Sequence, residues 1–360
     1  MDTTDPEISF DEHGNCNHCN DFIRYIDNEM PSSQEKSEII QEMLTKIKSR
    51  KGKYDCVIGI SGGVDSAYLA ITAKKEWGLN PLVVHMDNGW NSEQSVINVA
   101  NICEALKIDY ECTVLDWSEF KELQLSVLRS SIVEVDMPTD IAISSILHKA
   151  AAKYNIKYIF LGGNFATEGI LPNKWFYDPK DKKLLSAIFK RFSNKKIKKI
   201  PCFDFKQEIY YKFVKGITIL YPLNLISYDK TEIMEMLIND FNYVPYGGKH
   251  HENYFTKFCQ GYLQPKKFSL DYRRATFSSL ICNDLMKRED ALLELQNSPW
   301  KSFDLEKTLN FVASKLDLTR YELDEIVNDP PSSYKNYPNN EKFLTFLYSI
   351  YRMYFKKLLK

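Results

Sequence analysis

The sequence shows no excess of charge of either sign. Its 360 residues include 47 Lys and Arg against 48 Asp and Glu, which gives a formal net charge of −1. So small a charge creates no overall field that would draw the chain onto nucleic acid or an anionic membrane surface. We therefore expect no nucleic-acid partner. With 44% hydrophobic residues, the chain is long enough for one large domain with appendages or for two domains.

Long apolar runs and secretion signals are also missing. No unbroken apolar stretch reaches the roughly 18 residues that a membrane-spanning helix requires. The opening residues, MDTTDPEISFDEHGN, contain neither the basic nor the apolar part of a secretory signal. These absences predict a cytoplasmic protein with no membrane span.

Cysteine is sparse. Eight cysteines are too few for a disulfide scaffold in a chain of this size, and in a reducing compartment they should be thiols or metal ligands. Only Cys16 and Cys19 have a spacing at which one loop can present two thiolates to zinc. A tetrahedral site needs two more ligands, and the sequence has no second CxxC pair. Further ligands could come from His13, His18, Cys202, Cys259 or Cys282.

Three interpretations of the cysteine pair stay open. Cys16 and Cys19 could hold structural zinc, could be inert thiols, or could have a redox or sulfur-carrying role. The cysteines at 56, 103 and 112 fall within strand or helix patterns. We expect these three, Cys56, Cys103 and Cys112, to be small core residues.

The apolar pattern divides the chain into three parts. Residues 1–50 form an acidic lead-in that carries the cysteine pair, and an amphipathic helix is expected at 34–51. Residues 229–360 show helical patterns only, beginning after Asp229 and recurring at 271–287, 304–316 and 341–359. Residues 51–228 alternate between two types: strands expected at 54–60, 81–86, 110–115, 157–161 and 217–221, and helices expected at 66–77, 92–106, 117–129 and 140–154. This alternation predicts an α/β fold whose parallel five-stranded sheet is covered on both faces.

One polar stretch lies where α/β sheets bind ligands. Ser61-Gly62-Gly63-Val64-Asp65-Ser66 directly follows a predicted strand and opens a helix. Its glycines let backbone N–H groups point inward, its serines offer hydroxyls, and the new helix presents free N–H groups and a positive dipole end. The stretch therefore predicts a phosphate site. Because Asp65 would repel a polyphosphate unless a divalent cation lay between them, we expect a Mg²⁺-nucleotide.

The same six residues could instead be a plain turn in which Ser66 caps the helix. SGGVDS, however, resembles the SGGxDS loop of the PP-loop ATP pyrophosphatases, which include parts of GMP, asparagine and NAD synthetases and of tRNA thiolation enzymes. The resemblance implies a sheet of the adenine-nucleotide alpha-hydrolase type, ATP and Mg²⁺ as cofactors, and cleavage to AMP and pyrophosphate. It also implies catalytic roles for Asp65 and Ser66. The loop lacks the Gly-Lys-Ser/Thr ending of a Walker A motif.

Two further turns close the second and fourth predicted strands. Alone, each could be an ordinary turn. Both fall at carboxyl ends of parallel strands, where such sheets bind ligands. The resemblance implies adenine and ribose contacts at the first turn and a further nucleotide-facing turn at the second. The residues concerned are His85, Asp87 and Gly89, and then Gly162, Gly163 and Asn164.

A longer likeness runs from residue 8 to about residue 295. It is carried by ISFDEHGNCNHC, SGGVDSAYLA, HMDNGWNS, MPTDIAI, LGGN and YGGKHHENYFTKFCQGYLQPKKFSLDYRRATFSSLI, which resemble the N-acetyl sugar amidotransferases of surface-polysaccharide synthesis, the WbpG and PseA type. The resemblance implies an ATP-dependent enzyme that forms a C–N bond. It would adenylate the amide oxygen of an acetamido sugar, free or nucleotide-linked, and ammonia would displace AMP to leave an acetamidino group. Since no glutaminase is recognisable in the chain, the likeness also implies glutaminase and cyclase-like partner subunits that supply ammonia.

The segment 246–274 is the expected sugar-binding part. Its glycines permit close backbone approach, and its cations could contact phosphates or a sugar carboxylate, although each could equally belong to a basic surface. We expect catalytic roles for Lys249 and His250, and His250 or His251 could deprotonate ammonium because imidazole titrates near neutral pH. The expected substrate-binding residues are Gly247, Gly248, Lys249, His250, His251, Lys267, Arg273 and Arg274.

Two competing functions remain. A tRNA sulfurtransferase would share the loop and could use Cys16 and Cys19 as persulfide carriers or cluster ligands, but the balanced charge counts against it. A non-catalytic nucleotide sensor would keep the sheet without releasing pyrophosphate. Such a sensor has no use for the carboxylate of Asp65, so Asp65→Ala should leave its nucleotide affinity nearly intact.

Overall fold

The computed structural model describes residues 1–246, 248 and 251–346. Within these residues, five strands form one parallel sheet in the order β3-β2-β1-β4-β5, which confirms the predicted fold class. The strands are β1 (Cys56–Gly59), β2 (Pro81–Asp87), β3 (Asp109–Val114), β4 (Tyr158–Phe160) and β5 (Thr218–Leu220). Because all of them run in parallel, their carboxyl ends meet along one edge of the sheet.

Both faces of the sheet are covered. Ile58 of β1 lies opposite Val83 of β2, and Val57 of β1 lies opposite Ile159 of β4. Successive side chains of a strand point to opposite faces. Val57 and Ile159 therefore join one buried cluster, whereas Ile58 and Val83 join another. Burial on both sides explains why these strands are apolar runs without polar alternation.

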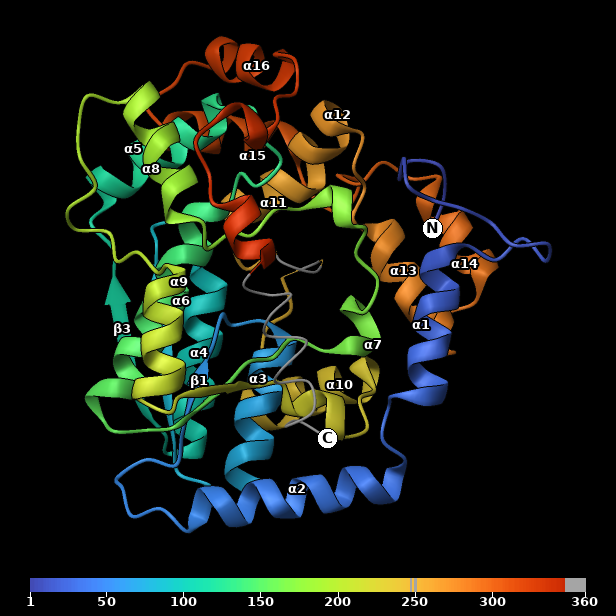
Figure 1. The fold of residues 1–360 in the computed structure, drawn as a ribbon, viewed down its shortest axis with the longest axis vertical. Helices are drawn as coiled ribbons and strands as arrows, with labels where there is room; N and C mark the ends of the chain where they lie inside the picture. The colour runs from blue at the N-terminus through green and yellow to red at the C-terminus, as the bar shows by residue number, and fades with distance from the viewer. Residues whose placement is uncertain (247, 249–250, 347–360) are drawn as a thin grey trace.

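Helices fill the connections between the strands and cover the sheet (Figure 1). Polar caps fix several helix starts: Ser92 accepts from the backbone N–H of Ser95 before α4, and Asp116 accepts from that of Glu119 before α5. The helices up to β5 and directly after it are α1 (Asn17–Asn28), α2 (Ser33–Lys48), α3 (Val64–Ile71), η1 (Thr72–Glu76), α4 (Glu93–Leu106), α5 (Trp117–Arg129), α6 (Met137–Lys153), α7 (Phe165–Glu168), η2 (Asn173–Trp175), α8 (Lys182–Phe192), α9 (Phe205–Ile209), η3 (Tyr210–Val214) and η4 (Pro222–Leu225).

Beyond Tyr228 the described chain is helical, as predicted. Asp229 caps α10 by accepting hydrogen bonds from the backbone N–H groups of Thr231 and Glu232 at 2.8 and 3.2 Å. The helix expected at 271–287 is shorter, because the left-handed backbone of Asp284 (φ 58°) stops the chain from continuing as a helix after Cys282. These helices are α10 (Lys230–Phe241), α11 (Tyr254–Phe258), η5 (Cys259–Leu263), α12 (Gln264–Phe268), α13 (Arg273–Cys282), α14 (Arg288–Leu295), α15 (Leu305–Lys315), α16 (Arg320–Asn328) and η6 (Tyr334–Asn336). Residues 341–346 are also helical, and the rest of the expected last helix lies outside the described residues.

The N-terminal segment is attached to the C-terminal helices. Figure 1 shows α1 beside α13 and α14, and α1 and α13 are in contact. Phe22 of α1 also stacks on Phe165 of α7, with ring centroids 4.3 Å apart. The cysteine pair, at the start of α1, is thereby brought close to residues that lie more than 250 positions further along the chain. Within the described ranges, no helix is both long enough and apolar enough to cross a membrane.

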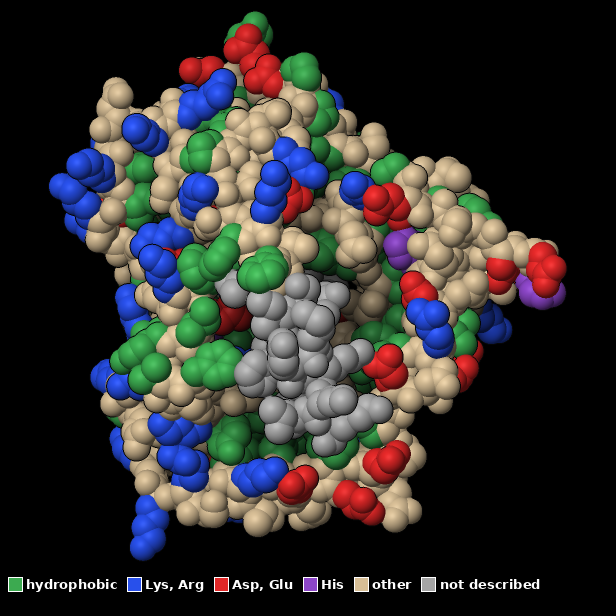
Figure 2. Space-filling view, viewed as in Figure 1, with side chains coloured by type: hydrophobic (Ala, Val, Ile, Leu, Met, Phe, Trp, Pro, Cys, Tyr) green, Lys and Arg blue, Asp and Glu red, His purple; other side chains and the backbone are tan. Residues whose placement is uncertain are grey.

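The surface corrects one expectation about the core. Cys56 and Cys103 are buried, but Cys112 is exposed, so its assignment to the core is wrong. The reason is that Cys112 lies on β3, an edge strand whose side chains are only partly covered. Charge is spread over the surface: in Figure 2, Lys and Arg side chains gather along the left edge, while Asp and Glu are interspersed elsewhere.

Candidate nucleotide-binding site

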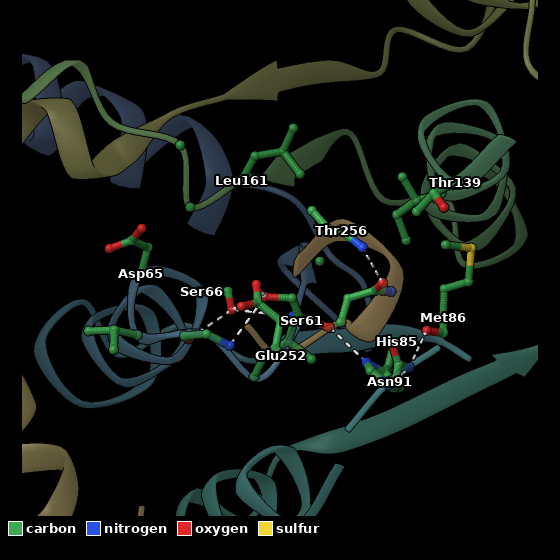
Figure 3. A pocket seen from close by; sticks show the side chains of 18 of the residues that line it. Ser61, Asp65, Ser66, His85, Met86, Asn91, Thr139, Leu161, Glu252 and Thr256 are labelled. Atoms are coloured by element: carbon green, nitrogen blue, oxygen red, sulfur yellow. Dashed lines mark hydrogen bonds between the residues drawn. The ribbon is translucent and has the colours of Figure 1, made fainter. Parts of the chain in front are cut away.

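A cavity of about 530 Å³ opens at the carboxyl ends of β1, β2 and β4. Besides the strand ends, its lining includes the loop 61–66, the first turn of α6, and the segment 243–260 of the C-terminal region. Figure 3 shows the side chains that face this space. Ligands of parallel α/β sheets bind at this edge, so the cavity is the candidate functional site.

The loop has contacts that only glycine allows. Gly62 has a φ of +87°, and a Cβ on it would lie 2.5 Å from the carbonyl oxygen of Ser95. A Cβ on Gly162, after β4, would lie 2.9 Å from the backbone N of Ser66. The helix begins at Val64, two residues before the expected start, with Gly63 as its N-cap. The free N–H groups of its first turn therefore lie at the loop, where they suit an anion.

The two loop serines have different surroundings. Ser66 is buried, and its hydroxyl donates to the carbonyl oxygen of Gly63 at 3.1 Å and accepts from the backbone N–H of Ser61 at 3.3 Å. It therefore stabilises the loop from within, and the alternative in which Ser66 is the helix N-cap is wrong. Ser61 is exposed to the cavity, and its Oγ accepts from the backbone N–H of Gly63 at 3.2 Å.

Two carboxylates flank the loop. Asp65, in the first turn of α3, accepts a hydrogen bond from the hydroxyl of Tyr228. Glu252 accepts one from Ser61 Oγ at 3.3 Å. Burial raises the pKa of Glu252, and the charge of Asp65 adds to the rise. A divalent cation held between carboxylates and phosphates would relieve this repulsion. The loop, the helix terminus and the two acids together fit a Mg²⁺-nucleotide.

Sequence reasoning missed Glu252, because the stretch KHHENYF was interpreted through its basic residues. The structure shows the C-terminal region closed over the loop: the hydroxyls of Tyr243 and Tyr246 donate to the carbonyl oxygen of Gly62 at 3.0 and 3.3 Å. The backbone N–H of Ser92 also donates to the carbonyl oxygen of Glu252 at 2.8 Å. A single acid inside a basic stretch was the available signal, but its neighbour in space could not be read from the sequence.

Of the three residues expected at the end of the second strand, only His85 lines the cavity. Its Nδ1 lies 2.8 Å from a backbone carbonyl oxygen, and its Nε2 lies 3.0 Å from Nδ2 of Asn91. With both nitrogens engaged, the ring holds Asn91 at the cavity wall. Asp87 accepts from the backbone N–H of Gly89 at 2.8 Å, and neither residue belongs to the lining. These two residues shape a turn of the fold, and their assignment to the nucleotide stays a prediction.

At the end of the fourth strand, Gly162 and Gly163 line the cavity. Asn164 is buried and caps α7, because its Oδ1 accepts from the backbone N–H of Thr167 at 3.0 Å. The close approach of Gly162 to Ser66 therefore brings the fourth strand end against the loop. Asn164 contributes to the site through the position of this turn, not through a place in the lining.

The expected sugar-binding residues are divided. Gly247, Lys249 and His250 lie outside the described residues. Gly248 lines the cavity, and its backbone N–H donates to Nδ1 of His251 at 3.0 Å. Burial lowers the pKa of His251 to about 4. This imidazole is consequently neutral at physiological pH and is a weak base.

Three of the expected basic residues lie outside the lining of the cavity, and their assignment to the sugar stays a prediction. Lys267 is buried, and its Nζ donates to Ser131 Oγ at 2.8 Å. Arg273 forms an ion pair with Asp271 at 2.7 Å, and Arg274 pairs with a carboxylate of the N-terminal segment. The physical reason is that these cations are already bound to partners that hold the helices together.

A second pair of carboxylates lies at another part of the cavity wall. Asp136 directly precedes α6 and Asp140 lies in its first turn, and both line the cavity. In Figure 3, Thr139 of the same turn is far across the view from Asp65. Thr256 Oγ1 donates to Asp136 Oδ2 at 2.6 Å, whereas the buried Asp136 Oδ1 has no hydrogen-bond partner within the described part of the chain. Asp136 is partly buried and Asp140 is exposed to the cavity; loss of hydration raises the pKa of both carboxyl groups, and the charge of Asp136 adds to the rise at Asp140.

The cysteine pair is joined by a third thiol. The Sγ atoms of Cys16 and Cys19 are 3.4 Å apart. Cys282, at the end of α13, lies beside Cys19, and this contact lowers the pKa of Cys282. Of the distant cysteines considered above, Cys282 is thus the one that approaches the pair. Nevertheless, in the part of the chain that the structure describes, no group of three or more His, Cys, Asp or Glu side chains is arranged to hold a metal ion.

Two family models match parts of the chain. Residues 35–129, which include the loop, match the NAD synthase model. Residues 252–352 match the model described as LPS biosynthesis protein WbpG-like, C-terminal domain. The sheet order, the loop and the match to the NAD synthase model define a parallel α/β domain of the PP-loop type. Beyond that domain, residues 252–352 are similar to the WbpG-like C-terminal domain.

The curated relatives are similar over short segments. An uncharacterised protein of Methanocaldococcus jannaschii is 26% identical over 115 residues, which are 32% of this chain and 40% of that protein. The tRNA-specific 2-thiouridylase MnmA of Prochlorococcus marinus is 32% identical over 82 residues, which are 22% of this chain and 20% of that protein. The matched segments therefore span less than half of either relative.

Among solved structures, the similarity is more extensive but distant. NMN synthetase from Francisella tularensis is 15% identical, with a TM-score of 0.35, over 84% of this chain and 89% of that one. The NH3-dependent NAD synthetase from Campylobacter jejuni is 17% identical, with a TM-score of 0.36, over 84% of this chain and 99% of that one. Similarity at this level identifies no substrate.

Proposed function

We propose that the chain is an ATP-dependent amidotransferase that converts the acetamido group of a bacterial surface-polysaccharide sugar into an acetamidino group. One observation carries the proposal: Glu252, the first residue of the WbpG-like match, accepts a hydrogen bond from Ser61 of the phosphate loop. The part of the chain that is similar to a polysaccharide enzyme therefore shares one cavity with the part that is similar to NAD synthase.

The chemistry of an amide explains why ATP is needed. Nitrogen resonance makes the amide carbonyl a poor electrophile, so its oxygen must first become a good leaving group. In the proposed reaction, that oxygen attacks the α-phosphorus of ATP, pyrophosphate leaves, and an O-adenylyl imidate forms. Ammonia then adds to the imidate carbon, and AMP departs with the oxygen. The loop and the start of α3 would hold the phosphates, and Asp65 and Glu252 would hold the Mg²⁺ that neutralises their charge.

Ammonia would come from partner subunits, a glutaminase and a cyclase-like protein. This part of the proposal rests on the resemblance to the WbpG and PseA type and on the absence of a recognisable glutaminase in the sequence. Adding such subunits with glutamine should replace an ammonium salt in the assay. Unchanged dependence on free ammonium in their presence would contradict it.

The central test is an assay with ATP, Mg²⁺, an ammonium salt and a panel of acetamido sugars. We expect equal amounts of AMP and pyrophosphate, and a sugar product that is lighter by the difference between O and NH. Formation of ADP, or AMP release without a change in the mass of any sugar, would contradict the proposal.

A second candidate function is tRNA thiolation. The three neighbouring thiols and the partial similarity to a 2-thiouridylase favour it. The balanced charge and the WbpG-like C-terminal match count against it. A titration of tRNA at increasing salt separates the two functions, because a sugar enzyme should show no notable affinity at physiological ionic strength.

Structural zinc at Cys16 and Cys19 also stays a proposal. Cys282 is the third ligand that the structure offers for it. Metal analysis of the purified protein, compared with Cys282→Ser, tests the assignment. We expect one zinc ion per chain in the wild-type protein and a lower zinc content in the Cys282→Ser variant. Wild-type protein that is fully folded without metal would identify the three cysteines as inert thiols.

A further inference from the structure

We infer that Asp136 and Asp140 bind ammonium in the cavity and accept the protons that the amidation step releases. The inference rests on the proposed function and deepens it, because it assigns a place to the nitrogen substrate. Both carboxylates line the same cavity as the phosphate loop. They are four residues apart at the start of α6, a spacing that puts two side chains on one face of a helix.

The first observation is a set of acceptors that lacks a donor. Asp136 Oδ1 and Gln124 Oε1 are buried atoms that have no hydrogen-bond partner among the described residues. Gln124, on α5, is fully buried and lies against Asp136. Buried acceptors that stay unpaired are costly, so such a group indicates a missing ligand. Ammonium brings four N–H donors and one positive charge, which match acceptors beside two carboxylates.

The second observation concerns the charges around the pair. The Asp140 carboxyl has no hydrogen-bonding or cationic partner in the described ranges. Cys259 and Tyr272 are close enough to be influenced by the two acids, but burial raises the pKa of both, so they stay neutral. Of the basic residues on the described cavity lining, His85 has both nitrogens engaged, and Lys230 belongs to α10, which packs against α3. A small cation is therefore the ligand that would balance this part of the cavity.

The proton count of the reaction needs such acceptors. When ammonium is the nitrogen source, an amide and ATP become an amidinium, AMP and pyrophosphate with the release of two protons. The first passes from ammonium to the Asp140 carboxylate, and the lone pair of ammonia then attacks the imidate carbon. The C–N bond forms, the C–O bond to AMP breaks, and AMP leaves with the electron pair. The second proton leaves the new nitrogen of the tetrahedral adduct and passes to Asp136. A carboxylate of raised pKa suits this task, because it is the stronger base.

The kinetic test uses Asp140→Asn and Asp136→Asn, with Glu134→Gln as a matched control. Glu134 is a neighbouring enclosed acid that does not belong to the cavity lining. With ammonium as the nitrogen source, we expect KM for ammonium to rise by about tenfold or more in both Asn variants, while KM for ATP and for the sugar stays unchanged. With hydroxylamine, a nucleophile that is neutral near pH 7, the Asp140→Asn defect should largely disappear. The control should behave like the wild type with both nucleophiles.

Other outcomes overturn the inference. An equal loss with ammonium and hydroxylamine would make the pair structural, and a rise confined to KM for the sugar would make it a sugar-binding pair. A binding measurement is independent of turnover: ammonium chloride should raise Tm more than sodium chloride at equal concentration in the wild type, but not in Asp140→Asn. If this difference in Tm is present but ATP yields AMP with none of the sugars, the proposed function fails and the ammonium site stands. If AMP forms but KM for ammonium is the same in both Asn variants as in the wild type, the ammonium site fails and the proposed function stands.

Discussion

The two ends of the cavity are built in opposite ways. At the phosphate end, one hexapeptide is hydrogen-bonded within itself, as the contacts between Ser61, Gly63 and Ser66 show, and side chains of the C-terminal region such as Glu252 bind to it. At the other end, Asp136 lines the cavity and lies against Gln124 of α5, and one oxygen of each side chain has no donor among the described residues. The first end presents N–H groups to an anion, and the second presents oxygens to a cation. Opposite charges at separate ends allow one cavity to hold two reactants in a fixed orientation.

Asp65 gives the strongest test of the difference between the two ends of the cavity. Asp65→Asn keeps an oxygen that can accept from Tyr228, so the loop should fold as before. The variant lacks the charge that would hold Mg²⁺, and we expect pyrophosphate formation to fall by about 1,000-fold or more. Turnover is measured as pyrophosphate release, and folding as Tm.

The same variant distinguishes the enzyme from a nucleotide sensor. A sensor does not release pyrophosphate, and its ATP affinity would be nearly the same with Asn at this position. Wild-type pyrophosphate release in Asp65→Asn would show that the carboxylate has no part in catalysis.

A second prediction concerns the backbone of the loop. In Gly62→Ala, the new Cβ would meet the carbonyl oxygen of Ser95 at 2.5 Å, and the residue would keep a φ of +87° only under strain. We expect kcat/KM for ATP to fall by about 100-fold, because misplaced N–H groups no longer hold the phosphates.

Gly216→Ala is the matched control. Gly216 has a φ of +64°, but a Cβ there has nothing within 4 Å. It should cost about 1 kcal/mol of unfolding free energy and leave kcat/KM unchanged. Equal losses of kcat/KM in both variants would mean that a general loss of stability explains the effect at Gly62.

Much of the phosphate end could be predicted from the sequence, because its signals are local. The strand, the paired glycines and Asp65 are neighbours in the chain, and the parallel sheet order follows from the alternation of strands and helices. The other end could not be predicted in this way. Asp136 directly precedes MPTDIAI and Asp140 lies within it. Their place on the cavity wall depends on how α6 packs against the sheet.

The positions of the basic residues could not be predicted for a related reason. Lys267 carries the positive charge that a phosphate ligand needs, but its hydrogen-bond partner Ser131 is 136 positions away in the chain. Arg273 is paired with Asp271, and Arg274 with the N-terminal segment. A cation next to a predicted site is informative only when its own partners are known, and those are set by tertiary packing.

Glu252 tests whether the two acids at the phosphate end act together. Glu252→Gln keeps an oxygen that can accept from Ser61 Oγ but removes the charge. We expect kcat to fall by about tenfold and the Mg²⁺ concentration for half-maximal rate to rise, because one carboxylate remains to hold the ion. The measurement is a Mg²⁺ titration at saturating ATP. A lower Mg²⁺ requirement would instead mean that Glu252 repels the phosphates.

The smallest effect is expected at Glu134, which separates an acid that lines the cavity from one that does not. Burial raises the pKa of Glu134 from its usual value of 4.5 to about 7. The folded protein therefore holds this proton more tightly than the unfolded chain does, so this group's contribution to stability is greatest below pH 4.5 and is lost as the pH rises to about 7. Glu134→Gln removes that loss. At pH 8 its unfolding free energy should exceed that of the wild type by about 1–3 kcal/mol, with little difference at pH 4. Urea unfolding at the two pH values measures this, and a variant that is less stable at pH 8 would show that the Glu134 carboxylate is stabilised by a partner.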